Sequence, residues 1–282
     1  MKFETIGIVG AGQMGIGIAQ VCAAAGLPVL LNDVDASALK RGMDRLSASY
    51  DRLVSKGTLT AAQTADAMAR VKAEPELGAL ARCDVLIEAA TENVRIKQQI
   101  MRDLEAVARS DAVIATNTSS VSITKLAATL ADPSRFVGMH FFNPVPAMTL
   151  VEVIRGMQTG DATFDTTVAL AERLGKVAIP VKNAPGFVVN RILVPMINEA
   201  VFVLQEGSAR AEEIDAGMRL GANHPMGPLA LADLIGLDTV LSIMEVIRRD
   251  LDDPKYRAAP LLREMVDAGY LGRKTKRGFY FY

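Results

Sequence analysis

Only two residues in this chain carry an imidazole ring, so chemistry that needs a base titrating near neutral pH must use His140 or His224. His140 follows an apolar run at 136–139 that predicts a strand, and Glu152 stands twelve positions later, inside the next such run at 150–154. Two strands joined by a turn would bring the carboxylate beside the ring, where it would orient the imidazole and stabilise its protonated form. The spacing therefore predicts an acid–base pair, and the alternative is a histidine packed in the core beside two phenylalanines.

A glycine-rich segment, GAGQMG at 10–15, lies between a β-branched run at 5–9 and an Ala-rich segment that continues to residue 26. This order predicts a strand, a tight turn and a helix, the context in which a GxGxxG pattern binds a dinucleotide. The first glycine allows the turn, the second lets the backbone approach a pyrophosphate, and the third permits close packing of helix on strand. The helix N-terminus also presents amide groups to the anion. The predicted cofactor residues of this loop are Gly10, Ala11, Gly12, Gln13, Met14 and Gly15.

Asp33 follows the next predicted strand, at 28–32, and lies 18 positions after Gly15. A carboxylate there can accept hydrogen bonds from a ribose 2′-hydroxyl and would repel a 2′-phosphate. A glycine turn without a ligand would not require this residue. The two signals together favour dinucleotide binding, with NAD preferred to NADP.

Polar residues also follow two further predicted strands where each strand ends. A strand at 85–88 leads into a segment that contains Glu92, and a strand at 113–116 leads into Asn117–Ser120. Because the carboxyl ends of parallel strands share one edge of a sheet, these residues are expected at the edge where open α/β folds bind ligands. Taken alone, the two serines would be expected to cap the helix that follows. Their clustering with the other strand ends favours a functional role for Ser119.

The composition excludes several classes of protein. The chain has 282 residues, with 31 basic and 32 acidic residues and a formal net charge of −1, which lacks the basic excess typical of nucleic-acid or anionic-membrane binding. Cys22 and Cys83 have no CxxC spacing, so neither a disulfide scaffold nor a metal site is expected. No run of eighteen apolar residues and no secretory leader pattern is present. We expect a soluble, cytoplasmic protein.

The alternation of predicted strands and helices as far as residue 180 indicates a Rossmann-type, doubly wound and mostly parallel α/β sheet. Residues 36–70 predict an inserted helical hairpin, interrupted near residue 56 and restarted by Thr60 as an N-cap. The remaining strands are expected at 5–9, 28–32, 85–88, 113–116, 136–139, 150–154 and 177–181, with helices near 94–109, 122–130 and 163–174.

After residue 180 the strand pattern disappears, and helices are expected at 187–206, 212–219, 229–250 and 260–268. We therefore predict an NAD-binding domain at 1–184 and an all-α domain for substrate binding and dimerisation at 185–282. His224 is expected in a loop or at a helix start of the second domain. The basic cluster Arg273–Arg277 is expected to be a solvated tail.

Seven motifs occur together along the chain: Gly10–Gly15, Ala89–Asn93, Asn117–Ser120, His140–Pro146, Pro185–Arg191, His224–Pro228 and Gly272–Tyr280. This combination resembles the 3-hydroxyacyl-CoA dehydrogenase family over essentially the whole chain. The resemblance implies NAD-dependent oxidation of an L-3-hydroxyacyl-CoA to the 3-ketoacyl-CoA, or the reverse reduction. It also implies short acyl-CoA substrates such as acetoacetyl-CoA and 3-hydroxybutyryl-CoA, and a homodimer formed through the helical domain.

The resemblance assigns roles residue by residue. His140 matches the catalytic base and Glu152 its carboxylate partner, while Ser119 and Asn190 match the residues that hold the reacting oxygen and orient the histidine. Asn143 matches a residue at the junction of nicotinamide and substrate. Besides the glycine loop and Asp33, the implied cofactor residues are Glu92, Lys97, Asn117, Ser119, Asn143 and Lys274. The implied substrate residues are Ser119, Asn143, Asn190 and, toward coenzyme A, Ser49 and Lys56.

Two other functions fit the same residues. A relative on this scaffold could oxidise a free hydroxy acid, as a carnitine or gulonate dehydrogenase does. A non-catalytic protein could retain dinucleotide binding and lose turnover. The joint presence of His140, Glu152, Ser119 and Asn190 argues against the non-catalytic alternative.

Overall fold

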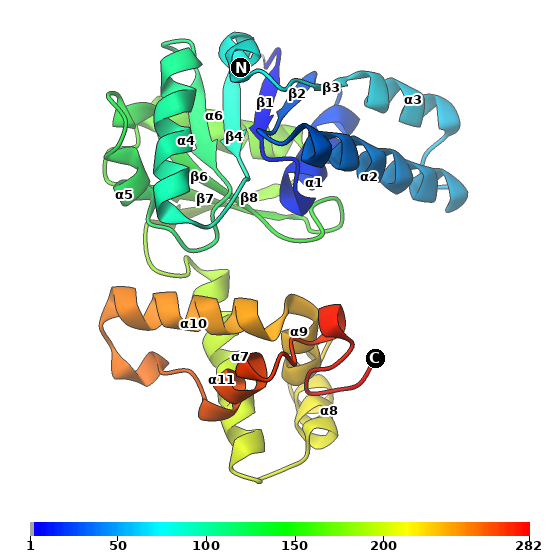
Figure 1. The fold of residues 1–282 in the computed structure, drawn as a ribbon, viewed down its shortest axis with the longest axis vertical. Helices are drawn as coiled ribbons and strands as arrows, with labels where there is room; N and C mark the ends of the chain where they lie inside the picture. The colour runs from blue at the N-terminus through cyan, green and yellow to red at the C-terminus, as the bar shows by residue number, and fades with distance from the viewer. Residues whose placement is uncertain (1–2) are drawn as a thin grey trace. The chain divides into compact units, whose positions relative to one another are not determined.

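The computed structural model describes residues 3–282 and divides the chain into two compact units (Figure 1). The first unit extends to Asn183 and the second comprises Ala184–Tyr282. The division lies one residue before the boundary expected from the sequence. Within the described residues, no helix is both long enough and apolar enough to cross a membrane.

The first unit is built on one eight-stranded sheet with the order β3-β2-β1-β4-β5-β6-β7-β8. Every neighbouring pair is parallel except β6 and β7, which are antiparallel. This arrangement confirms the predicted mostly parallel, doubly wound sheet. The strands are β1 Ile6–Val9, β2 Val29–Asn32, β3 Val71–Ala73, β4 Val85–Glu88, β5 Val113–Thr116, β6 Phe136–Phe141, β7 Leu150–Arg155 and β8 Val177–Lys182.

The helices of this unit follow the expected order, including the hairpin after the second strand (Figure 1). Thr60 caps the second helix of the hairpin, because its side chain accepts a hydrogen bond from the amide of Gln63. The α-helices are α1 Gln13–Ala24, α2 Ala36–Ser55, α3 Ala61–Ala69, α4 Val94–Val107, α5 Ile123–Ala127 and α6 Asp161–Arg173, and short 3₁₀ turns lie at Leu77–Arg82 and Pro133–Arg135.

The two faces of the sheet carry different residues. Helices α1, α2 and α6 share one apolar cluster with alternate strand residues such as Ile8, Ile87 and Met139. The intervening strand positions face the other side, where α4 and α5 lie: Lys97 of α4 reaches Glu88, and Gly138 lies against Ile123 of α5. The strand register places the polar side chains of the predicted site on this second face.

One strand was not predicted. Residues 71–73 pair with β2 as the edge strand β3, directly after the hairpin. Only Val71 of its three residues is buried, so no apolar alternation distinguishes it from a loop.

The second unit is all-helical around a single apolar cluster, as expected. The predicted single helix at 229–250 is wrong, because Gly236 adopts a φ of 103° and separates two helices. The helices are α7 Val189–Gln205, α8 Ala211–Gly221, α9 Pro228–Ile235, α10 Leu237–Leu251 and α11 Pro260–Asp267, with 3₁₀ turns at Pro254–Tyr256 and Arg273–Thr275.

The C-terminal segment is folded onto this unit and is not a free tail, but the five residues of the basic cluster at 273–277 are exposed to solvent, as expected. Asp233 is buried and accepts hydrogen bonds from the amides of Phe279 and Tyr280. Lys274 of the basic cluster forms an ion pair with Asp238. The contacts of Asp233 and Asp238 thus hold the C-terminal segment in place while the basic side chains stay solvated.

Candidate active site

The centre of the site is the pair formed by His140 and Glu152. The antiparallel register of β6 and β7 places these two residues opposite each other, and His140 Nδ1 lies 2.7 Å from Glu152 Oε2. His140 is 5% exposed and Glu152 is fully buried. The Phe142 ring packs against the imidazole, with 4.5 Å between the two ring centroids, and limits its rotation. The contact orients the ring as an acid–base group requires.

Ser119 contacts Glu92 at the neighbouring strand ends. Its amide and its hydroxyl donate to Glu92 Oε1 at 2.8 and 3.0 Å, and Thr118 Oγ1 donates to Oε2 at 2.7 Å. Helix α5 is capped by Ser122 instead, which accepts from the Lys125 amide. The capping interpretation of Ser119 and Ser120 is therefore wrong, since the cap lies further along the chain.

Beneath Glu92, a buried ion pair joins α4 to β4. Lys97 Nζ lies 2.7 Å from Glu88 Oε2 and 3.7 Å from Glu92 Oε2, and Thr116 Oγ1 donates to Glu88 at 2.7 Å. Lys97 is 2% exposed and Glu88 is fully buried. This burial leaves Lys97 little surface for a direct cofactor contact, and we propose that it acts by holding Glu92.

Three of these partners, Glu88, Thr116 and Thr118, were not predicted as site residues. Glu88 is a charged residue at the end of an otherwise apolar strand, and that contrast is a signal in the sequence. The two threonines give no such signal, because threonine is common in strands.

The glycine loop follows β1 and contacts two other parts of the site. Asp33 Oδ2 accepts a hydrogen bond from the Ala11 amide at 2.8 Å. Gln13 Nε2 donates to Asn143 Oδ1 at 2.9 Å across 130 positions of sequence. Met14 is partly buried against the apolar cluster. Gln13 therefore connects the glycine loop to the segment that begins two residues after His140.

Gly12 and Gly15 are small for different reasons. A Cβ at Gly15 would overlap the carbonyl oxygen of Gly10, so the turn itself requires glycine there. A Cβ at Gly12 would meet no atom of the chain within 4 Å, and a φ of −73° suits any residue. The fold does not require glycine at position 12. The open space beside it fits a ligand that approaches the backbone closely.

We expect Gly12→Ala to keep its Tm within about 2 °C of the original and to weaken NADH binding by about tenfold or more. The added methyl group would enter the space of the pyrophosphate without touching the chain. Gly15→Ala is the matched variant, in which both Tm and affinity should fall because of the overlap with Gly10. Thermal unfolding and the fluorescence of bound NADH measure the two effects. Unchanged NADH affinity in Gly12→Ala would contradict the assignment.

The structure shows the local contacts of three further predicted site residues. Asn117 is buried, and its Oδ1 accepts from the Phe141 amide at 2.8 Å, so it links β5 to β6 beside His140. Ser49 lies on α2, and Lys56, seven positions later, is the C-cap residue of that helix, so both face the same side. Ser49 Oγ donates to Gln20 at 3.0 Å, and Lys56 is exposed at the end of the helix. Their ligand contacts stay predictions.

Asn190 and Lys274 belong to the second unit. Asn190 lies half-buried in the first turn of α7, and Lys274 pairs with Asp238 at the start of α10. His224 lies in the loop between α8 and α9, where its amide donates to Met218. The roles of Asn190 and Lys274 stay predictions.

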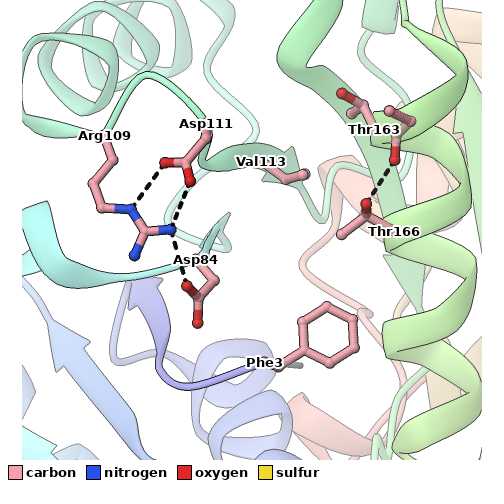
Figure 2. Close-up of a pocket in the computed structure, with 8 residues that line it drawn as sticks. Phe3, Asp84, Arg109, Asp111, Val113, Thr163 and Thr166 are labelled. Atoms are coloured by element: carbon pink, nitrogen blue, oxygen red, sulfur yellow. Dashed lines mark hydrogen bonds and ion pairs between the residues drawn. The ribbon is translucent and has the colours of Figure 1, made fainter. Parts of the chain in front are cut away.

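A hollow of about 330 Å³ lies where the strands begin, at the edge opposite to the glycine loop (Figure 2). Arg109 forms ion pairs there with Asp84 at 3.1 Å and with Asp111 at 2.9 Å. The charged side chains that line this hollow are therefore paired with one another. The hollow therefore has fewer groups available to bind a ligand than the carboxyl edge of the sheet has.

Other kinds of reactive centre are not supported. Burial raises the pKa of both the Cys22 and the Cys83 thiol to about 12, so neither is a thiolate nucleophile at neutral pH. Across residues 3–282, no group of three or more His, Cys, Asp or Glu residues is placed to hold a metal ion. The carboxyl edge with His140 remains the best candidate site.

Comparison with known families agrees with this geometry. Residues 5–184 match the NAD-binding domain of 3-hydroxyacyl-CoA dehydrogenase, and residues 186–282 match the C-terminal domain of the same enzyme. The chain belongs to the 3-hydroxyacyl-CoA dehydrogenase family. Its first unit is the family's NAD-binding domain, which confirms NAD as the expected cofactor.

Individual relatives agree with the family assignment. A 3-hydroxybutyryl-CoA dehydrogenase of Bradyrhizobium diazoefficiens is 53% identical over 99% of this chain and 95% of its own. The crystal structure of (S)-3-hydroxybutyryl-CoA dehydrogenase from Ralstonia eutropha superposes with a TM-score of 0.97 at 56% identity, covering 100% and 99% of the two chains. A 5-formyl-3-hydroxy-2-methylpyridine-4-carboxylic acid 5-dehydrogenase, described as an NAD⁺-dependent dismutase, gives 0.80 at 32% identity, with coverage of 100% and 91%.

Proposed function

We propose that this chain is an NAD-dependent L-3-hydroxyacyl-CoA dehydrogenase in which His140 is the acid–base residue. The observation that carries the proposal is the 2.7 Å contact between His140 and Glu152, in a hairpin that the Gln13–Asn143 hydrogen bond connects to the glycine loop. A base and a dinucleotide loop in one connected region are what a hydroxyl-to-ketone oxidation requires.

In the oxidation direction, the O–H proton of the substrate moves to His140 Nε2 and the C3–H bond breaks as the C3=O double bond forms. NAD⁺ supplies the acceptor for the departing hydride. Glu152, held at Nδ1, stabilises the imidazolium, which then releases its proton to solvent. In the reduction direction His140 returns the proton to the oxygen.

Ser119 is proposed to hold the reacting oxygen, a role that the family resemblance also assigns to Asn190. A serine hydroxyl has one proton, and Ser119 directs it to Glu92 at 3.0 Å, so its oxygen is left to accept a hydrogen bond. The alcohol substrate has a single O–H proton and donates it to His140, so its oxygen can only accept a hydrogen bond from Ser119. To donate to the substrate oxygen, in the alcohol or in the ketone, the Ser119 hydroxyl must turn away from Glu92.

Other predicted residues are proposed to bind NAD and coenzyme A directly. Asp33 would accept from the adenosine ribose, and the open space beside Gly12 fits the pyrophosphate. Asn143, beside Gln13, would lie near the nicotinamide. Ser49 on α2 and Lys56 at its C-terminal end would meet coenzyme A, where an exposed lysine suits a phosphate group.

The deciding assay compares oxidants of NADH. Acetoacetyl-CoA should be reduced with a kcat/KM at least about tenfold above that of free acetoacetate, and NADH should be preferred to NADPH. Faster reduction of the free acid would favour the hydroxy-acid alternative. NADH binding without consumption of NADH with short- or long-chain 3-ketoacyl-CoA would favour the non-catalytic alternative.

A homodimer and a cytoplasmic location are also proposed. The second unit exposes several apolar side chains that a second copy would cover, among them Ile192, Leu220, Leu234 and Phe281. Size-exclusion chromatography with light scattering should give twice the chain mass of 30.1 kDa. A monomer mass would contradict the dimer. Both cysteines are free and buried, which suits a reducing compartment.

A further inference from the structure

Lys176 is a buried cation that no predicted role uses. It precedes β8 and is 8% exposed. Its Nζ donates to the carbonyl oxygens of Val145 at 2.7 Å and Met148 at 2.8 Å. Within residues 3–282 no carboxylate forms an ion pair with it. Burial accordingly holds the pKa of Lys176 below its ordinary value.

Both carbonyls belong to one segment, residues 142–149, which joins β6 to β7 and which we call the connecting loop. The loop closes on itself, because the amides of Ala147 and Met148 both donate to the Pro144 carbonyl at 3.0 Å. The carbonyl oxygens of Val145 and Met148 accept neither of these hydrogen bonds, and each accepts one from Lys176 instead. A buried ammonium is retained only where such acceptors compensate its lost hydration.

The connecting loop joins the two halves of the proposed site. Its first residue, Phe142, packs on the His140 ring, and its second, Asn143, accepts from Gln13 of the glycine loop. Its fourth residue, Val145, is 2% exposed and packs against α1 at Gly17. The position of this loop therefore sets the spacing between the acid–base pair and the cofactor loop.

We propose that Lys176 is a positioning residue that holds the connecting loop, and with it Asn143 and Phe142, at the distance that hydride transfer requires. The inference rests on the proposed function. It assigns no contact between Lys176 and substrate or cofactor. Lys176 acts through two backbone carbonyls, so its loss should loosen the loop and leave the His140–Glu152 pair intact.

The test is Lys176→Met, which keeps the length of the side chain and removes the donors. Lys182→Met is the matched control, because it makes the same change at an exposed position of β8. In Lys176→Met, the amides of Ala147 and Met148 should exchange hydrogen at least about tenfold faster, while those of β6 and β7 stay protected. The kcat/KM for acetoacetyl-CoA reduction should fall about 10- to 100-fold, with the acid limb of its pH profile unmoved.

Lys176→Arg keeps the cation and its donors and should recover kcat/KM to within about fivefold of the original. If Lys176→Met does not fold, Lys176→Gln, which removes the charge and keeps a neutral NH2 group, is tested by the same exchange and kinetic measurements. The inference would be overturned if Lys176→Met left hydrogen exchange of the connecting loop unchanged and kept kcat/KM within about twofold of the original. Uniformly faster exchange with normal kcat/KM per folded molecule would also overturn it, because Lys176 would then serve stability alone.

The outcome is separable from the proposed function. If the original protein binds NADH but reduces no acyl-CoA, the proposed function fails. Hydrogen exchange of the connecting loop and the NADH dissociation constant then still test the proposed role of Lys176. That constant should rise about threefold or more in Lys176→Met and stay unchanged in Lys182→Met.

Discussion

Replacing His140 with Gln is expected to lower kcat for acetoacetyl-CoA reduction by about 10²–10⁴-fold, the range for loss of a general acid–base group. Glutamine approximates the size of the ring and retains a donor, so the hairpin should keep its register. NADH binding should persist, because the glycine loop and Asp33 are untouched. Steady-state kinetics and NADH fluorescence measure the two quantities.

His224→Gln is the matched control, since it changes the one other histidine, which lies in a loop of the second unit. Its kcat should stay within about threefold of the original. Equal kcat values for the His140 and His224 variants would refute the proposed mechanism. Loss of both turnover and NADH binding in His140→Gln would instead indicate disrupted structure, and the experiment would then move to Glu152→Gln, where kcat should also fall.

The second large effect is on stability. Lys97→Met should lower the free energy of unfolding by about 3–5 kcal/mol, because Glu88 would be left as an uncompensated buried charge. Glu88 is fully buried, and its remaining partners are the neutral groups of Thr116 and Ala90. Urea unfolding followed by circular dichroism measures the change.

The double variant Lys97→Met with Glu88→Gln removes both charges and should recover most of that loss, since a neutral pair needs no compensation. Lys125→Met makes the same lysine change at an exposed position of α5 and should alter stability by less than about 0.5 kcal/mol. If the double variant is no more stable than Lys97→Met alone, the ion pair is not the source of the effect.

The most local patterns were the most predictable. The order of strand, glycine turn and helix at 5–26 could be predicted because turn chemistry and apolar period act within a few residues. The hairpin and its Thr60 cap were predicted for the same reason. The spacing of His140 and Glu152 also predicted their contact, because a short connection between two strands leaves them little freedom of register.

The sequence by itself thus determined the fold class, the glycine loop and the candidate acid–base pair. Only the tertiary structure decided the partners of the buried charges: Glu88 for Lys97, two loop carbonyls for Lys176, and the C-terminal amides for Asp233. It also decided the helix break at Gly236. The physical reason is the separation along the chain over which each effect acts. Propensity and periodicity act between neighbours, whereas a buried ion or carboxylate is stabilised by whichever groups packing brings to it from distant parts of the chain.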